Sequence, residues 1–371
     1  MSDIHAGFSS SYRDAREKFL AAAESAGLPV QSHVHPLAGR DGEVLAMDVA
    51  RDGPDDAECL LILSSACHGV EGYCGSGVQV FALNDSAWLA HARENAAGKT
   101  LAVLYIHALN PYGFSHLRRV THENVDLNRN FHDFSQALPV NAGYRDIASM
   151  LLPTEWPPSS DNVARVEAHI AKIGLSGYQA AFTGGQHEFS DGLFFGGSAP
   201  TWSNLTLRRV LRQHGRKAAH IGWIDFHTGL GPSGHGERIF AGWEDAAAIA
   251  RARRWWDGGG KTPITSTYDG SSSSAPLTGM MWCAARDECP QAEHTGIAME
   301  YGTVPVRDVL QALRAEQWLN LHPEAQAEQA RHIKQQFKDA FYTDTDAWRE
   351  QIVRQGMESV RQAVAGLRAK P

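Results

Sequence analysis

The chain has 371 residues, of which 43% are hydrophobic and 20% are charged, as expected for a globular protein with a large core. Its 42 acidic residues exceed its 34 Lys and Arg residues, so the formal net charge of −8 disfavours nucleic acid as a partner. The sequence has no apolar run near the ~18 residues of a membrane span and no basic-then-apolar start typical of a signal peptide, so we expect a cytoplasmic protein that does not contact membranes.

The first third of the chain alternates between predicted helices and strands. Two of the predicted strands are continuous apolar runs, which are typical of strands buried on both faces of a parallel sheet. In chain order we predict a helix at 12–26, a strand at 44–49, a strand at 60–64, a helix at 77–83 and a strand at 101–106.

The alternation continues through the rest of the chain. Three stretches, 152–160, 182–204 and 268–276, are rich in Gly, Pro, Ser or aromatic residues and predict loops. The pattern indicates an α/β fold with a mixed, mostly parallel central sheet flanked by helices, and with ligand sites beyond the carboxyl ends of the strands. The further predicted elements are helices at 163–173, 205–214, 244–255 and 306–321, strands at 221–226, 238–241 and 297–299, and one or two closing helices at about 323–371.

His68 and Glu71 directly follow the apolar run 60–64. Zinc binds imidazole nitrogen and carboxylate oxygen, and a catalytic zinc keeps one position open for water. A His-x-x-Glu sequence at a strand-to-helix turn can present both groups to one ion. Because this spacing is common, two structural residues are the alternative.

His227 and Glu300 also stand where predicted strands end, after 221–226 and 297–299. The histidine is placed to be a third metal ligand, or else a hydrogen-bonded core imidazole. A carboxylate at the end of a buried strand is costly unless it is paired or functional, and in a low-dielectric cleft its pKa suits a general base. A structural salt bridge is the alternative for Glu300.

A cluster of arginine and asparagine residues lies between these sites: Arg118, Arg119, Asn128 and Arg129. The planar fork of arginine matches a carboxylate, and asparagine supplies further hydrogen bonds. The cluster therefore suits an anionic group of a substrate, with a structural turn as the alternative.

In combination these motifs resemble the zinc carboxypeptidases and their deacylase relatives, the M14-like metallopeptidases. The details His-Gly-Val-Glu-Gly and Asp-Phe-His-Thr-Gly are similar to a divergent bacterial branch of metallopeptidase-like proteins (DUF2817-like). The resemblance rests, in chain order, on His68-x-x-Glu71, Asn110-Pro111-Tyr112-Gly113, Asp126-Leu127-Asn128-Arg129-Asn130-Phe131, His227 and Glu300.

The resemblance implies a role for each matched residue. His68, Glu71 and His227 would bind one Zn²⁺ ion. Glu300 would activate a water molecule and then protonate the leaving amine. Arg119 would polarise the scissile carbonyl and stabilise the oxyanion.

Four further residues complete the implied site. Asn128 and Arg129 would hold a carboxylate of the substrate, and Asp126 would accept a hydrogen bond from the metal-binding His68. Arg118 competes with Arg119, because the spacing to Asn128 differs from that of the digestive enzymes.

One feature of the digestive enzymes, a mobile tyrosine upstream of the catalytic glutamate, has only a weak counterpart here. Tyr268 lies in a serine-rich loop of that region, but the residues around it do not match. The residues that contact the substrate side chain cannot be aligned either: Arg286, Asp287 and His294 lie in the right stretch, and the sequence assigns none of them.

The resemblance implies a zinc-dependent hydrolase that cleaves an amide bond next to a free carboxylate. We expect a single metallopeptidase-like catalytic domain over residues 1–371, with a helical C-terminal segment at about 323–371. Short peptides are the first substrate class. N-acyl amino acids, as in aspartoacylase-like deacylases, are the second. A non-catalytic binding protein on the same scaffold is the alternative of a different class, and the oligomeric state is left open.

Overall fold

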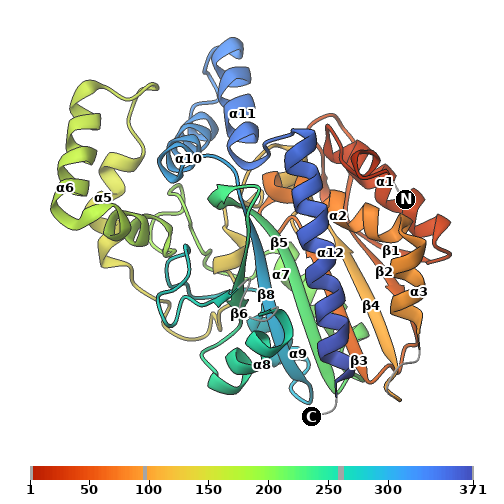
Figure 1. The fold of residues 1–371 in the computed structure, drawn as a ribbon. Coiled ribbons are helices and arrows are strands. Elements are labelled where there is room, and N and C mark those ends of the chain that lie inside the picture. Colours follow the sequence, from red (N-terminus) through yellow and green to blue (C-terminus); the bar gives the residue numbers. More distant parts are fainter. Residues whose placement is uncertain (1–2, 95–97, 258–262, 370–371) are drawn as a thin grey trace.

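The computed structural model describes residues 3–94, 98–257 and 263–369, which contain an eight-stranded sheet in the order β1-β2-β4-β3-β5-β8-β6-β7 (Figure 1). The strands are β1 (Val30–Ala38), β2 (Val44–Asp52), β3 (Cys59–Ser65), β4 (Leu101–His107), β5 (His220–Ser233), β6 (Gly236–Ala241), β7 (Ile264–Thr265) and β8 (Glu293–Gly302).

The centre of the sheet is parallel. Strands β4, β3, β5 and β8 pair in parallel, whereas β2 pairs antiparallel with β4, and β6 pairs antiparallel with β8. Along β3, Leu61 and Leu63 pack into one core cluster, and Leu60 and Ile62 pack into another. Because successive side chains of a strand point to opposite faces, both faces of the sheet are covered. The expected mixed, mostly parallel α/β fold is confirmed.

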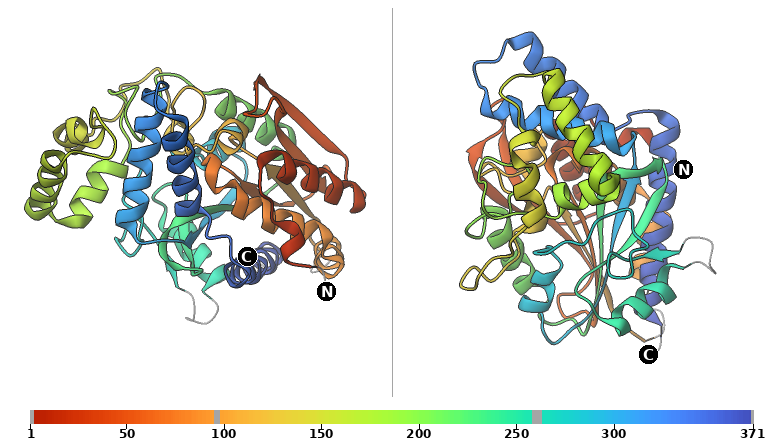
Figure 2. Two further views of the ribbon diagram at one scale, coloured as in Figure 1. Left: turned by 90° about the horizontal axis from the view of Figure 1, so that it is seen from above. Right: turned by 90° about the vertical axis from the view of Figure 1, so that its left-hand side faces the viewer.

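Helices cover the two faces of the sheet as separate layers (Figure 2). One layer contains α1 (Tyr12–Ser25), α2 (Gly72–Asn84), α3 (Ser86–Arg93), α8 (Ala246–Trp256) and α12 (Asp346–Arg368). The other contains α7 (Trp202–His214) and α9 (Cys283–Glu288). Short helical turns complete the connections: η1 (His5–Gly7), η2 (Gly69–Glu71), α4 (Pro111–Ser115) and η3 (Leu127–Arg129).

A third group of helices lies beyond the carboxyl ends of the central strands. It consists of α5 (Ala142–Leu151), α6 (Ser160–Thr183), α10 (Val306–Leu321) and α11 (Ala327–Phe341). Tyr144, Phe182, Leu310 and Phe337 pack together with Val70 of η2 in a separate apolar cluster. These helices therefore form a wall above the edge of the sheet where the polar motifs lie (Figure 1).

The structure differs from the predicted elements mainly by addition. Strands β1 and β7 and helices α3, α4, α5 and α9 were not predicted, while the helices predicted at 77–83 and 163–173 lie within the longer α2 and α6. Strand β1 was missed because it is an exposed edge strand whose His and Ser residues give no apolar pattern. The C-terminal tail contains two helices, α11 and α12. Its predicted last residues, 370–371, lie outside the described residues, and the single-domain organisation stays a prediction.

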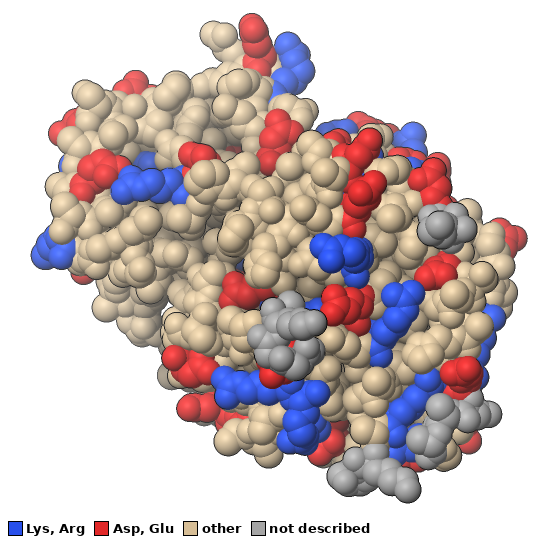
Figure 3. Space-filling model, in the orientation of Figure 1, with Lys and Arg blue, Asp and Glu red and all other residues tan. Residues whose placement is uncertain are grey.

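The surface carries interspersed charges of both signs on the face drawn in Figure 3. Among the helices of the described ranges, none is both long enough and apolar enough to cross a lipid bilayer.

Candidate active site

The two histidines and Glu300 come from three neighbouring parallel strands. His68 follows the end of β3, whereas His227 lies in β5 and pairs in register with Glu300 of β8. Since the carboxyl ends of parallel strands meet at one edge of the sheet, residues that are far apart in the sequence come together there.

The turn that carries His68 and Glu71 depends on a close backbone contact. A Cβ atom at Gly69 would lie 2.0 Å from the carbonyl carbon of Gly113, so only glycine fits. The amide of Gly69 donates to the carbonyl of Arg119 at 3.0 Å. The contact explains why the His-Gly-Val-Glu and Asn-Pro-Tyr-Gly motifs occur together, and it places Arg119 beside the turn.

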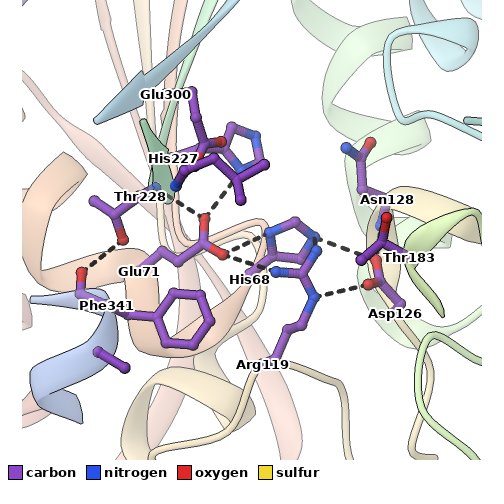
Figure 4. A network of polar contacts seen from close by, with 12 residues as sticks. His68, Glu71, Arg119, Asp126, Asn128, Thr183, His227, Thr228, Glu300 and Phe341 are labelled. Carbon is purple, nitrogen blue, oxygen red and sulfur yellow. Dashed lines mark hydrogen bonds and ion pairs between the residues drawn. The ribbon is translucent and has the colours of Figure 1, made fainter. Parts of the chain in front are cut away.

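His68, Glu71 and His227 form one compact cluster (Figure 4). Nδ1 of His68 lies 2.9 Å from Oε1 of Glu71, and Nδ1 of His227 lies 3.1 Å from Oε2. Each residue offers a ligand atom within 4.8 Å of the other two, and all three side chains are buried. The cluster has the two nitrogens and the carboxylate that zinc prefers, so the residues fit this metal.

A second carboxylate supports each histidine from the opposite side of the ring. Oδ1 of Asp126 lies 3.2 Å from Nε2 of His68, and Oδ2 of Asp225 lies 2.5 Å from Nε2 of His227. Burial lowers the pKa of His227, but the negative charge of Asp225 outweighs burial and raises this pKa well above its ordinary value. Such carboxylates orient a metal-binding imidazole. The sequence prediction included Asp126 and missed Asp225, although Asp-x-His in a strand places both side chains on one face.

Arg119 joins this cluster, and Arg118 does not. Arg119 donates from Nε to Asp126 at 2.9 Å and from Nη1 to Glu71 at 3.0 Å. Arg118 points away and donates to Glu316 and Gln317, each at 3.0 Å. The structure therefore places only Arg119 beside the metal-ligand candidates, and it does not bring Arg118 to them.

Asn128 and Arg129 lie on the other side of Asp126. Asp126 begins the short helical turn η3 that carries both residues, because the backbone amide of Asn128 donates to Oδ1 of Asp126 at 3.0 Å. The guanidinium of Arg129 donates from Nε and Nη2 to the backbone carbonyl of Thr183, and from Nη1 to the backbone carbonyl of Asn128. Each terminal nitrogen carries two N–H groups; Nη1 also lies 3.7 Å from Oδ1 of Asp126, and the Arg129 side chain lines the cavity.

Glu300 lies in β8, beside His227 of β5. Its Oε1 accepts a hydrogen bond from the amide of Leu230 at 3.0 Å. Burial, together with the negative charge of Glu71, raises the pKa of Glu300 to about 7. A carboxyl group with this pKa can accept and return a proton near neutral pH.

The three candidate metal ligands, Glu300, Arg119, Asn128 and Arg129 line one cavity, whose free space together with its open mouth is about 850 Å³. Tyr268 is not among the lining residues: its hydroxyl donates to the carbonyl of Gly242 at 2.9 Å, and its neighbour Thr267 lines the cavity instead. The structure does not bring Tyr268 to the cavity as a substrate-binding residue. The predicted residues that line it are His68, Glu71, Arg119, Asn128, Arg129, His227 and Glu300.

The fold and the cluster together define a candidate metal centre at the carboxyl edge of an α/β sheet. The chain belongs to the family described as "Protein of unknown function (DUF2817)", whose model matches residues 8–355. The DUF2817-like branch expected from the motifs is thereby confirmed. No curated protein matches the sequence.

Solved structures that are similar to this chain include three of low sequence identity. Bovine thrombin-activatable fibrinolysis inhibitor, in complex with tick carboxypeptidase inhibitor, has a TM-score of 0.45 and 10% identity over 92% of this chain and 100% of that chain. The metallo-carboxypeptidase from Pseudomonas aeruginosa has a TM-score of 0.39 and 15% identity over 94% and 69%. The murein-tripeptide amidase from Escherichia coli O157 has a TM-score of 0.34 and 15% identity over 79% and 90%.

Proposed function

We propose that the protein is a zinc-dependent hydrolase that cleaves an amide bond next to a free carboxylate. The observation that carries this proposal is that one cavity is lined by three candidate metal ligands, a carboxyl group with a raised pKa, and two arginines. Metal, proton acceptor and anion-binding groups are the three components that such a hydrolysis needs.

One zinc ion would be held by His68, Glu71 and His227. Bound there, it would lower the pKa of a water molecule and polarise the carbonyl oxygen of the substrate. Asp126 and Asp225 keep the two imidazoles in orientation through contacts at 3.2 and 2.5 Å, which reduces the reorganisation that binding requires.

Glu300 accepts the proton of the attacking water and returns it to the leaving amine. Its pKa of about 7 makes both directions accessible at neutral pH. Arg119 provides a fixed positive charge where negative charge develops on the carbonyl oxygen, and this kind of stabilisation is usually the largest catalytic contribution. The ion pairs of Arg119 with Asp126 and Glu71 hold it in place.

Arg129 and Asn128 bind the free carboxylate of the substrate. Both residues line the cavity, and a guanidinium group and a side-chain amide can each donate hydrogen bonds to carboxylate oxygens. Binding the carboxylate as well as the scissile carbonyl fixes the orientation of the substrate and reduces the entropic barrier of the reaction.

A second candidate, hydrolysis of N-acyl amino acids, is favoured by an apolar wall. The third helical group contributes Val309, Leu310 and Leu313 from α10 and Phe341 from α11 to the cavity. These side chains suit a short apolar acyl group better than the polar backbone of a longer peptide.

The direct test combines zinc content with a substrate panel. We expect one zinc per chain after reconstitution, and turnover of dipeptides, tripeptides or N-acyl amino acids that is lost with a chelator and restored by zinc. A preference for N-acyl amino acids over tripeptides selects the deacylase. Stoichiometric zinc without turnover of any panel member would refute the hydrolase in favour of a binding protein, and substoichiometric zinc would refute the metal site itself.

A further inference from the structure

Two buried arginines of the candidate active site are held in different ways. Arg119 donates to Asp126 at 2.9 Å and to Glu71 at 3.0 Å. Nη1 of Arg129 lies 3.7 Å from Oδ1 of Asp126, the carboxylate oxygen with which it pairs. Burial lowers the pKa of Arg129; Asp126 opposes this effect, and the positive charge of Arg119 adds to it. Arg129 is therefore the arginine that needs a further stabilising contact.

The ring of Phe194 provides such a contact. Its centroid lies 5.4 Å from Cζ of Arg129 and 4.8 Å from Cζ of Arg119, within the ~6 Å over which the face of an aromatic ring attracts a cation. Phe194 is only 3% exposed, and the attraction is stronger in a place without water. Because the ring attracts the charge without accepting a conventional hydrogen bond, it leaves the N–H groups of the guanidinium to other partners.

One segment of the loop predicted at 182–204 surrounds Arg129. The backbone carbonyl of Thr183 accepts a hydrogen bond from Nη2 at 2.6 Å. A Cβ atom at Gly185 would lie 2.9 Å from Cδ of Arg129, so the glycine lets the chain pass close to this side chain. Phe194 belongs to the same segment. The carbonyl, the glycine and the ring therefore enclose one guanidinium group and its stem.

The backbone of Phe194 has a conformation that bulky residues rarely adopt. Its φ of 53° lies in the left-handed region. Two hydrogen bonds fix it: the amide of Gln186 donates to the carbonyl of Phe194 at 3.1 Å, and the amide of Asp126 donates to the carbonyl of Phe195 at 2.7 Å. Such conformations persist only where the surroundings enforce them, and they are concentrated at functional sites. Glycine would adopt this backbone without strain, so the phenylalanine indicates a need for the ring itself.

We propose that Phe194 is a positioning residue that holds the guanidinium group of Arg129 in place for the carboxylate of the substrate. The face of its ring offsets the repulsion between Arg129 and Arg119. The inference rests on the part of the proposed function that assigns carboxylate binding to Arg129. The alternative is that the ring only fills space against Phe182, whose ring centroid lies 5.5 Å away. A packing ring depends on its size, whereas a positioning ring depends on the negative charge of its face.

The test replaces Phe194 by mono-, di- and pentafluorinated phenylalanine through stop-codon suppression. Fluorine withdraws electrons from the face of the ring and changes its size little. An NMR titration of the zinc-reconstituted protein then measures the binding of two probes. One is levulinate, the ketone analogue of N-acetylglycine, which has no amide bond to cleave. The other is the uncharged ketone with an isopropyl group in place of the carboxylate.

We expect the dissociation constant of levulinate to rise stepwise with the number of fluorine atoms. The pentafluorinated ring should raise it about tenfold, the effect of losing one desolvated cation–π contact, while the affinity for the uncharged ketone stays within about twofold. An unchanged affinity for levulinate, or equal losses for both probes, overturns the inference. A wild type that binds levulinate no more tightly than the ketone also overturns it, since Arg129 then holds no carboxylate.

Phe337 provides the matched control. It is fully buried in the same apolar cluster as Phe194, and its ring centroid lies 5.1 Å from that of Phe341. Fluorination of Phe337 should leave the binding of both probes unchanged. A loss of levulinate binding equal to that caused at Phe194 overturns the inference, because it is then a general effect of fluorine in this cluster.

Two ordinary variants cover the case in which the fluorinated proteins do not fold. Phe194→Tyr keeps the face of the ring and should bind levulinate within about threefold of the wild type. Phe194→Leu keeps an apolar side chain without a ring and should bind levulinate about tenfold more weakly. Equal affinities of the two variants overturn the inference.

The binding assay also separates this inference from the proposed function. Fluorine-dependent binding of levulinate, in a protein that turns over no peptide or N-acyl amino acid, supports the role of Phe194 and refutes the hydrolase. Turnover together with fluorine-independent binding supports the hydrolase and refutes the role of Phe194.

Discussion

Replacement of His107 should change how the stability of the protein depends on pH. His107 ends β4 and is fully buried, with its ring stacked on Phe19 at 4.6 Å and its Nε2 2.9 Å from Oγ of Ser76. Burial lowers the pKa of His107 from 6.5 to about 4, with Asp48 acting against this shift and Arg16 adding to it.

The sign follows from comparing the two states. Between about pH 6.5 and 4, the imidazole of His107 is protonated in the unfolded chain and neutral in the folded one. The unfolded state therefore binds more protons in this window, so stability is complete above about pH 6.5 and falls as the pH drops. The pKa difference of about 2.5 corresponds to a loss of about 3 kcal/mol, a large part of the 5–15 kcal/mol that is typical of folded domains.

The assay is denaturant unfolding of the wild type and of His107→Gln at pH 7.5 and at pH 4.5. Gln keeps a polar group near Ser76 but does not titrate, so the variant should lose about 2–3 kcal/mol less than the wild type between the two pH values. The exposed His332 provides the control: His332→Gln should follow the wild type, because this ring is in water in both states. Parallel pH dependence of the wild type and His107→Gln would refute the reasoning.

Four other variants test the assignments made for the site and its surroundings. Asp225→Asn should weaken zinc binding about 10- to 100-fold in competition with a chromophoric chelator, and an affinity within twofold of the wild type would contradict its orienting role. Glu300→Gln should keep its zinc but lose at least ~10²-fold in kcat, and near-normal turnover would exclude Glu300 as the general base. Arg129→Ala should reduce kcat/KM for substrates with a free carboxylate far more than for amidated ones, whereas equal losses would remove the carboxylate clamp. Arg118→Met should lower the free energy of unfolding by at most about 3 kcal/mol, because Lys334 still pairs with Glu316 at 2.7 Å; a loss of turnover by the folded variant would reverse its assignment as a structural residue.

The central strands could be predicted because they are buried on both faces. The apolar runs at 60–64 and 101–106 became β3 and β4, since a strand covered by helices on both sides needs apolar residues without interruption. Strand β1 has mostly exposed residues at one edge of the sheet. Its position depends on pairing with β2, which no local pattern indicates.

Three residues of the candidate site could be predicted for a related reason. His68 follows the end of β3, and His227 and Glu300 lie in the carboxyl-terminal halves of β5 and β8, which parallel pairing brings to one edge of the sheet. Asp225 was missed because the sequence does not distinguish a structural carboxylate within a strand from one that supports a histidine. Only the contact with His227 shows its role.

The amino-acid sequence by itself determined the sheet centre, the order of the motifs and the residue types gathered at one edge, because these follow from hydrophobic pattern and strand direction. Only the tertiary structure decided which of two adjacent arginines faces the cluster, since Arg118 and Arg119 are chemically identical and differ only in the groups packed around them. It also decided that the ring of Phe194 lies over both Arg119 and Arg129, because that contact depends on the path of a loop whose sequence has no periodic pattern.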